Sequence, residues 1–229
     1  MAHHPSFTEL PTELPVTLIL ADTSAEAAWA REDDSVLTEQ ERNYAKEFDA
    51  EAAATWSAGR VVLRHVLGAH LDQDPAAIEI RLDSAGKPRH DECEFSVSRS
   101  RRLVLVSVSE DPVGLDVEAI PEREVALEAW QLLHERERAE LEALPDDAFA
   151  AGFVRVWART EAFLKALSTG LARDPGLDYI GAWPEPHSPH PDVDIHDGHS
   201  AAIPFTRRPH RHTTERIPRR SSAAADMYP

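Results

Sequence analysis

One short stretch, V-G-L-D-V-E-A-I at residues 113–120, constrains the fold more than any other part of this chain. Apolar residues alternate there with glycine and acids: Val113, Leu115 and Val117 against Gly114, Asp116 and Glu118. A period of two predicts a strand with one face in the core. The other face would then carry two carboxylates close together.

Neighbouring carboxylates repel each other by about 1–4 kcal/mol at effective dielectrics between those of water and a protein surface. A cation between Asp116 and Glu118 would remove that repulsion, and carboxylate oxygens suit Mg²⁺, with waters and phosphates completing the shell. The alternative is an exposed strand edge whose two acids are simply solvated.

A second charged group lies on the helix predicted over residues 148–168. Trp157, Glu161 and Lys165 follow one another at intervals of four and therefore share one face. Alone, the last two form an ordinary ion pair that contributes only about 0.2–0.5 kcal/mol. Read with Asp116 and Glu118, they give three carboxylates and a lysine, which can hold Mg²⁺ and a phosphate ester together.

Hydrophobic periodicity and turn residues predict α+β structure along the rest of the chain. The first half contains predicted strands over 16–21, 78–82, 95–98 and 103–109, helices over 24–30, 38–48 and 51–71, and turns over 84–88 and 99–102. After the acid-bearing strand we expect a helix over 121–142 with a solvated charge run over 135–142, and strands over 177–183, 193–196 and 200–205.

Three residues are expected to mark the ends of the helix over 148–168: Asp146 or Asp147 would cap its start, and Gly170 would close it. We divide the chain into lobes of residues 1–112 and 113–206. The basic tail over 207–229 is expected to be disordered.

Composition narrows the classes of function. The chain has 229 residues, is 42% apolar and carries a formal charge of −17, so nucleic acid and anionic membranes are disfavoured as partners. An anionic substrate would need a local basic pocket. Cys93 is the single cysteine, and no apolar run reaches membrane-spanning length, so we expect a cytoplasmic protein.

Two basic features could supply such a pocket. Arg60 and Arg64 lie four apart and share a helix face, which is either a solvated edge or a cationic rail for a phosphate. Lysine occurs only at positions 46, 87 and 165 of this arginine-rich chain, and Lys87 lies in the Gly86-Lys87-Pro88 turn.

Several motifs together resemble those of one family. V-G-L-D-V-E, followed downstream by W-A-R-T-E-A-F-L-K-A-L-S-T-G-L, resembles the signature pair of the surfactin-type (Sfp-type) 4′-phosphopantetheinyl transferases. The stretches W-S-A-G-R at 56–60, G-K-P at 86–88 and F-S-V-S-R-S at 95–100 resemble further family motifs in the same order. The resemblance covers residues 38–171.

This resemblance implies an α+β fold with two pseudo-symmetric lobes and coenzyme A in the cleft between them. It also implies Mg²⁺ as the metal, an apo acyl or peptidyl carrier protein as the second substrate, and a monomer. It places Asp116, Glu118 and Glu161 at the metal-ligand positions. Glu161 would also be the base for the carrier's serine hydroxyl, and Lys165 would contact the phosphate and assist departure of 3′,5′-ADP.

The adenosine and 3′-phosphate end of coenzyme A would lie, by the same resemblance, at Lys87, Pro88, Ser98 and position 99. Arg99 stands where the family usually has histidine, and arginine pairs with a phosphate bidentately and without titrating. Thr160 stands where many members have lysine, and Arg159 or water could compensate for the missing cation. Ser168-Thr169-Gly170 replaces the commoner G-x-G.

The residues leave two other interpretations open. A Mg²⁺-dependent phosphodiesterase can use the same D-x-E and E-x-x-x-K residues, although the charge of −17 argues against a nuclease. A non-catalytic relative that binds coenzyme A or a carrier protein would explain Arg99 and Thr160. Fatty-acid, polyketide and peptide-synthetase carriers all remain open as substrates, and by analogy with the family the carrier would dock on residues 121–144.

Overall fold

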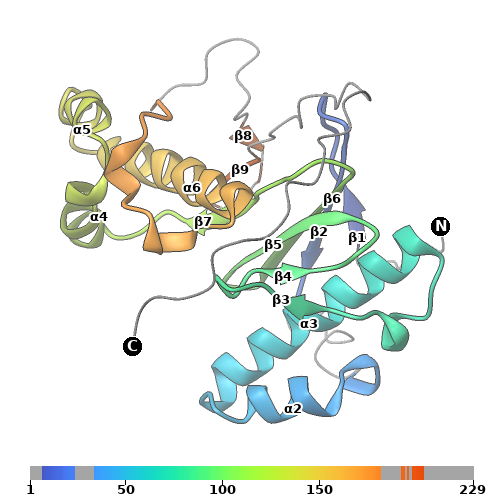
Figure 1. Ribbon diagram of the computed structural model, residues 1–229. Coiled ribbons are helices and arrows are strands. Elements are labelled where there is room, and N and C mark those ends of the chain that lie inside the picture. Colours follow the sequence, from blue (N-terminus) through green and yellow to red (C-terminus); the bar gives the residue numbers. More distant parts are fainter. Residues whose placement is uncertain (1–6, 24–33, 182–191, 194, 196–197, 204–229) are drawn as a thin grey trace, which may run out of the picture.

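The computed structural model describes residues 7–23, 34–181, 192–193, 195 and 198–203. Five predicted segments lie wholly or partly outside these residues: the helix over 24–30, the tail over 207–229, and parts of the strands over 177–183, 193–196 and 200–205. Figure 1 shows two groups of elements, α2 and α3 against one sheet, and α4, α5 and α6 around a smaller one.

The first group is built on a four-stranded antiparallel sheet in the order β1-β2-β6-β5. Its strands are β1 (Phe7–Glu9), β2 (Val16–Asp22), β5 (Glu94–Ser100) and β6 (Leu103–Ser109). Two helices lie beside it, α2 (Glu39–Ala45) and α3 (Ala50–Leu71), together with the 3₁₀ turns η2 (Asp34–Val36) and η3 (Pro75–Ala77). A small hairpin pairs β3 (Arg81–Leu82) with β4 (Pro88–Arg89).

Strand β6 is buried along its whole length because both of its faces are covered. Val104, Val106 and Val108 pack into one core cluster with α3, whereas Leu103 and Leu105 pack into another. The alternation L-V-L-V thus supplies two cores from one strand, which explains why this strand is apolar on both faces.

The second group contains a three-stranded antiparallel sheet in the order β7-β9-β8. Its strands are β7 (Asp116–Ala119), β8 (Asp192–Val193) and β9 (His199–Ala202). The helices are α4 (Arg123–Ala129), α5 (Glu135–Glu142) and α6 (Phe149–Leu167), with the 3₁₀ turns η4 (Trp130–Leu132), η5 (Gly170–Ala172) and η6 (Pro175–Leu177). Helix α6 packs against β7 and β9.

The two groups share a core, because one cluster contains Leu18 and Leu105 of the first sheet together with Leu115 and Val117 of the second. Strands β5 and β7 also lie side by side, and the Ala119 amide donates a 2.9 Å hydrogen bond to Ser100 Oγ. The predicted α+β class is confirmed. The lobe boundary at residue 112 stays a prediction.

The helix predicted over 121–142 is wrong, since the structure breaks it into α4, η4 and α5. The His134 side chain begins α5 by accepting a hydrogen bond from the Arg136 amide, and the His134 amide donates one to the Glu137 carboxylate, as in a capping box. Glu137 is also fully buried and accepts bonds from the Ile180 and Gly181 amides, so the charge run is not simply a solvated face.

Other helix and strand ends also differ from the predictions. Helix α6 begins after Ala148 with no side-chain cap, and it ends at Ser168 in the left-handed conformation, with a φ of 59°. The predicted caps at 146–147 and 170 are therefore wrong. The strand over 78–82 shrinks to two residues, and β5 runs on to Ser100 instead of turning at Arg99. Helix α2 begins with a capping box, a pattern that the sequence T-E-Q-E at 38–41 predicts: the Glu41 amide donates to Thr38 Oγ1, and the Thr38 amide donates to Glu41 Oε2.

Candidate active site

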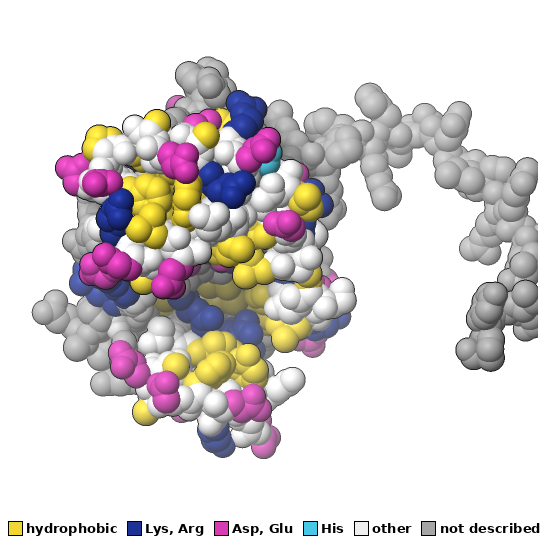
Figure 2. Space-filling view, turned by 90° about the vertical axis from the view of Figure 1, so that its left-hand side faces the viewer, with side chains coloured by type: hydrophobic (Ala, Val, Ile, Leu, Met, Phe, Trp, Pro, Cys, Tyr) yellow, Lys and Arg dark blue, Asp and Glu magenta, His cyan; other side chains and the backbone are white. Residues whose placement is uncertain are grey.

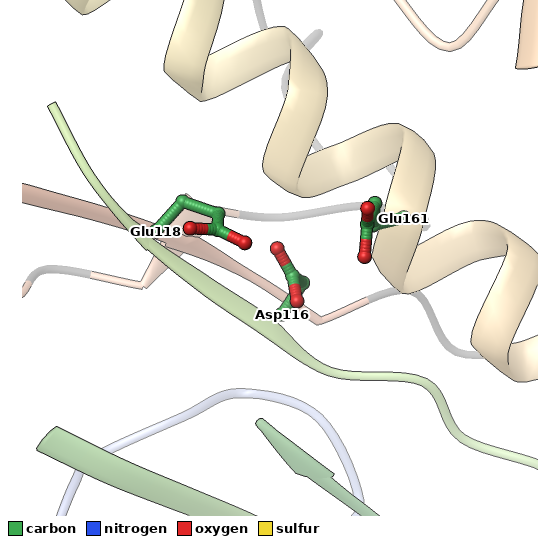
Figure 3. A group of neighbouring side chains, drawn as sticks. All are labelled: Asp116, Glu118 and Glu161. Carbon is green, nitrogen blue, oxygen red and sulfur yellow. The ribbon is translucent and has the colours of Figure 1, made fainter. Parts of the chain in front are cut away.

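Three acids from two elements meet beside the sheet of the second group. Asp116 and Glu118 come from β7 and Glu161 from α6, and each offers an oxygen that lies within 4.8 Å of those of the other two. Figure 3 shows the three carboxylates turned toward one another. Strand and helix residues that the sequence analysis joined only by hypothesis therefore lie together.

Gly114 is the residue that lets the strand approach the helix so closely. A Cβ at this position would lie 1.8 Å from the Ala162 carbonyl oxygen and 2.6 Å from the Ala166 amide nitrogen. No side chain fits there, so the backbone before β7 rests directly on α6. This crossing sets how near Asp116 comes to Glu161.

Lys165 reaches into the acid cluster from the next turn of α6. Its ammonium forms a close ion pair with Asp116 Oδ1 and lies 3.3 Å from Ser98 Oγ, whereas Glu161 Oε2 is 3.8 Å away. Ser98 in turn donates a 2.8 Å hydrogen bond to Asp116 Oδ1. The lysine's principal partner is thus the buried aspartate of β7 and not the glutamate of its own helix.

Burial and mutual repulsion disfavour ionisation of two of the acids. Burial, then the charges of Asp116 and Glu161, raise the pKa of Glu118 to about 7. Burial and Asp116 also raise the pKa of Glu161, and Lys165 partly offsets this. In addition, Asp116 Oδ2 is buried without a hydrogen-bond partner among the described residues. Carboxylate oxygens that are buried, repel one another and lack hydrogen-bond donors suit a divalent cation such as Mg²⁺.

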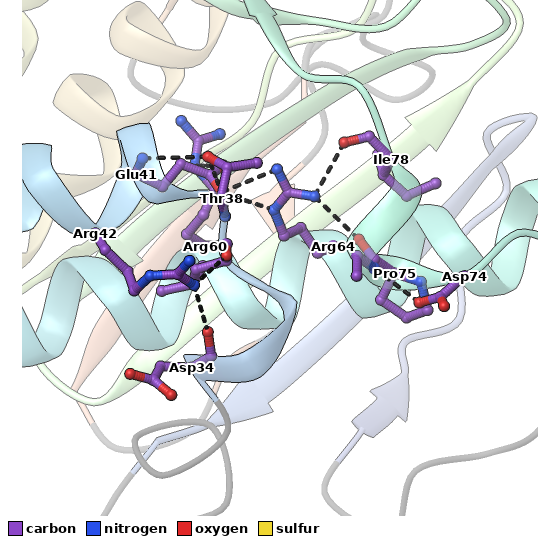
Figure 4. Close-up of polar contacts among 11 residues, drawn as sticks. Asp34, Thr38, Glu41, Arg42, Arg60, Arg64, Asp74, Pro75 and Ile78 are labelled. Atoms are coloured by element: carbon purple, nitrogen blue, oxygen red, sulfur yellow. Dashed lines mark hydrogen bonds and ion pairs between the residues drawn. The ribbon is translucent and has the colours of Figure 1, made fainter.

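The two arginines of the predicted phosphate rail have separate surroundings. Arg64 is buried, and its guanidinium donates to Glu41 Oε2 at 2.9 Å and to the carbonyls of Pro75 and Ile78 at 3.0 and 2.9 Å (Figure 4). All of these partners belong to the interior of the first group. We therefore assign Arg64 to the fold and not to a phosphate site.

Arg60 and Arg99 gather around Trp56. Arg60 lies over the indole ring at 5.2 Å and pairs with Glu41 Oε1 at 3.1 Å, whereas Arg99 donates to the Trp56 carbonyl at 3.3 Å. Burial, with the neighbouring charges of Arg64 and Arg99, lowers the pKa of Arg60. Figure 2 shows a hollow in the surface between the two groups, with Lys and Arg side chains inside it.

The G-K-P turn forms the hairpin between β3 and β4, as predicted. The Lys87 ammonium leaves this hairpin and donates to the carbonyls of Val113 and Lys165 at 3.0 and 2.7 Å. Burial first, and then nearby positive charge, lowers the pKa of Lys87 to about 8. Pro88 begins β4 and is half-buried.

Sequence reasoning missed Arg89 and the ion pairs of Glu41, because no motif marked them. Glu41 caps α2 and pairs with both Arg60 and Arg64, and Arg89 donates to Asp83, to Glu94 and, closely, to Ser168 Oγ. The suggested compensation by Arg159 for Thr160 is wrong. Arg159 is buried and donates to Asp192 Oδ1 at 2.8 Å and to the Gly181 carbonyl at 2.7 Å.

Comparison with known proteins points to one superfamily. Residues 112–214 match the family model described as the 4′-phosphopantetheinyl transferase superfamily. The chain is 33% identical over 126 residues to the 4′-phosphopantetheinyl transferase HetI of Nostoc sp., a match that covers 52% of this chain and 53% of that protein. The predicted resemblance is confirmed.

Two further relatives carry the same name. The chain is 27% identical over 138 residues to the 4′-phosphopantetheinyl transferase gsp of Aneurinibacillus migulanus, covering 60% of this chain and 58% of that one. It is 27% identical over 118 residues to the 4′-phosphopantetheinyl transferase Sfp of Bacillus subtilis, covering 50% and 52%. The chain thus spans a little over half the length of the curated relatives it matches.

Proposed function

We propose that this chain, whose residues 112–214 match the family model of the 4′-phosphopantetheinyl transferase superfamily, transfers the 4′-phosphopantetheine arm of coenzyme A to a serine of a carrier protein. The observation that carries the proposal is the meeting of Asp116, Glu118 and Glu161 with Lys165 inside the matched region. The serine oxygen would bond to the phosphorus of the pantetheine phosphate. The pyrophosphate P–O bond would break, and 3′,5′-ADP would leave.

The three acids would hold Mg²⁺. The support is chemical: two of the carboxyls have raised pKa values, and Asp116 Oδ2 is buried and lacks a hydrogen-bond partner among the described residues. When bound, the ion would neutralise charge on the coenzyme A pyrophosphate.

Two residues of α6 would act on the reacting groups. Glu161, with its raised pKa, would accept the proton of the serine hydroxyl, and such general-base assistance typically contributes about 10²–10⁴-fold. Lys165, oriented by Asp116 and Ser98, would place positive charge on the phosphate oxygens. Phosphoryl transfer depends on such positioning and charge neutralisation more than on covalent chemistry.

Basic residues of α3 and β5 would hold the nucleotide end of coenzyme A. Arg60 and Arg99 lie together at Trp56, and a guanidinium can pair with the 3′-phosphate bidentately. Pro88, at the start of β4 in the β3–β4 hairpin, would contact the adenosine. These positive charges would offset, locally, the overall charge of −17 that otherwise repels an anionic substrate.

The test combines the protein with coenzyme A, Mg²⁺ and apo carrier proteins of the fatty-acid, polyketide and peptide-synthetase types. Mass spectrometry should show the phosphopantetheine mass added to at least one carrier by the wild type, and no addition by Asp116→Asn. Light scattering of the same sample tests the proposed monomer. Coenzyme A binding without transfer to any carrier, or Mg²⁺-dependent cleavage of a nucleic acid, would overturn the proposal.

A further inference from the structure

Lys87 joins the two elements that carry the acids. Its ammonium bonds to the Val113 carbonyl, three residues before Asp116, and to the Lys165 carbonyl, in the last turn of α6. Val113 and Lys165 belong to different elements, and Lys87 belongs to a third, the β3–β4 hairpin. A single side chain therefore links the strand and the helix from outside both.

The link lies at the point where strand and helix cross. Gly114, next to Val113, packs against the backbone of Ala162 and Ala166, on either side of Lys165. The Lys165 carbonyl is one of the last of α6, where the helix end carries partial negative charge, and it accepts only one backbone bond among the described residues, from the Ser168 amide at 3.1 Å. An ammonium is suited to that place, because it offers several donors and a full positive charge.

The hairpin is braced so that Lys87 is held in position. Asp83 accepts 2.9 Å hydrogen bonds from the amides of Ala85 and Lys87, and a 3.1 Å bond from Arg89 Nε. Arg89 then reaches Ser168 Oγ, on the residue that ends α6. The hairpin thus holds the end of α6 at two points, one through Lys87 and one through Arg89.

We infer that Lys87 is a positioning residue for the acid cluster. By fixing the crossing of the β7 lead-in with α6, it sets the place of Asp116 relative to Glu161 and Lys165. This role differs from the expected contact of Lys87 with the adenosine end of coenzyme A, since two backbone carbonyls take two of the three donors of its ammonium. The inference rests on the proposed function, which it deepens.

The test replaces Lys87 with methionine, which keeps the apolar stem and removes the ammonium. Arg81→Met is the matched control, because Arg81 lies on the same hairpin, is exposed and pairs with the exposed Asp91. The measurements are Mn²⁺ binding by electron paramagnetic resonance, and kcat and KM for coenzyme A. We expect Lys87→Met to weaken Mn²⁺ binding and lower kcat, each by about 10–100-fold, as loss of an outer orienting partner does.

The KM for coenzyme A should change little in Lys87→Met, and Lys87→Arg should recover part of the loss. A raised KM with unchanged kcat and Mn²⁺ binding would overturn the inference, since it would show direct contact with coenzyme A. If Lys87→Met does not fold, Arg89→Met removes the second contact between the hairpin and the end of α6, the one with Ser168 Oγ. This variant should also weaken Mn²⁺ binding. Mn²⁺ binding is read without any carrier, so failure of the transfer assay leaves this comparison intact.

Discussion

Replacing Gly114 with alanine should separate the two elements that carry the acids. The new methyl group would lie 1.8 Å from the Ala162 carbonyl oxygen, and ordinary contact begins at 3.4 Å, so this distance must grow by about 1.6 Å. The second contact, 2.6 Å from the Ala166 amide nitrogen, is also to helix backbone. Neither neighbour can rotate away as a side chain could, and the strand itself must therefore move off α6.

That displacement is large compared with the spacing of the acids, whose ligand oxygens lie within 4.8 Å of one another. Misplacement by about 1 Å can cost about 10²-fold in rate, and overpacking typically costs about 1–3 kcal/mol of stability. A domain with about 5–15 kcal/mol of stability survives this. We therefore expect a folded Gly114→Ala protein whose kcat and Mn²⁺ affinity fall by about 10²-fold or more.

The assay is carrier modification followed by mass, with melting temperature and Mn²⁺ binding measured on the same preparation. Gly176→Ala is the control, because its new Cβ would meet the Leu132 carbonyl oxygen at 3.2 Å and needs only a small adjustment outside the acid cluster. A folded Gly114→Ala protein with wild-type rate and wild-type Mn²⁺ affinity would show that the close crossing of strand and helix does not set the site.

Three further predictions concern charge. Glu118→Gln should raise the melting temperature of the metal-free protein at pH 8, because it removes a buried negative charge that Asp116 and Glu161 repel. The same change should weaken Mn²⁺ binding at least about tenfold. A lower melting temperature would contradict this reasoning. The metal-free wild type should lose stability between pH 5 and 8, because folding raises the pKa of Glu118 from 4.5 to about 7, so that in this range the folded protein still binds a proton that the unfolded chain has released. The loss of stability from this group is at most about 3 kcal/mol. Thermal melts measure the loss, and added Mg²⁺ should reduce it. Arg64→Met should cost about 3–5 kcal/mol in urea unfolding because it leaves buried Glu41 with only Arg60, whereas the exposed control Arg81→Met should cost under about 1 kcal/mol.

Strands of strict alternation could be predicted from the sequence, because a period of two maps directly onto the two faces of a sheet. The predicted strand over 103–109 coincides with β6, and the apolar residues of the acid-bearing stretch, Val113, Leu115 and Val117, are all fully buried. The break between α4 and α5 could not be predicted in this way. It depends on His134 as a cap and on Glu137, whose partners at Ile180 and Gly181 lie far along the chain.

The arginine pair shows why spacing alone does not assign a site. Arg60 and Arg64 share a helix face, and both pair with Glu41, yet only Arg64 is enclosed, because η3 supplies the Pro75 carbonyl and the chain after it the Ile78 carbonyl. The local sequence of α3 does not indicate which of its arginines will donate hydrogen bonds to these carbonyls. Tertiary packing gives Arg64 a third role, inside the fold, which neither interpretation from the sequence included.

The same reasoning explains the charge balance of the acid cluster. Spacing of four predicts a pair between Glu161 and Lys165, but the strand brings Asp116 closer to the ammonium. One positive charge therefore offsets mainly the aspartate, and the raised pKa values of Glu118 and Glu161 mark the two acids that remain less compensated. Two such carboxylates facing each other across strand and helix match the charge of a divalent cation, whose oxygen shell can include all three acids.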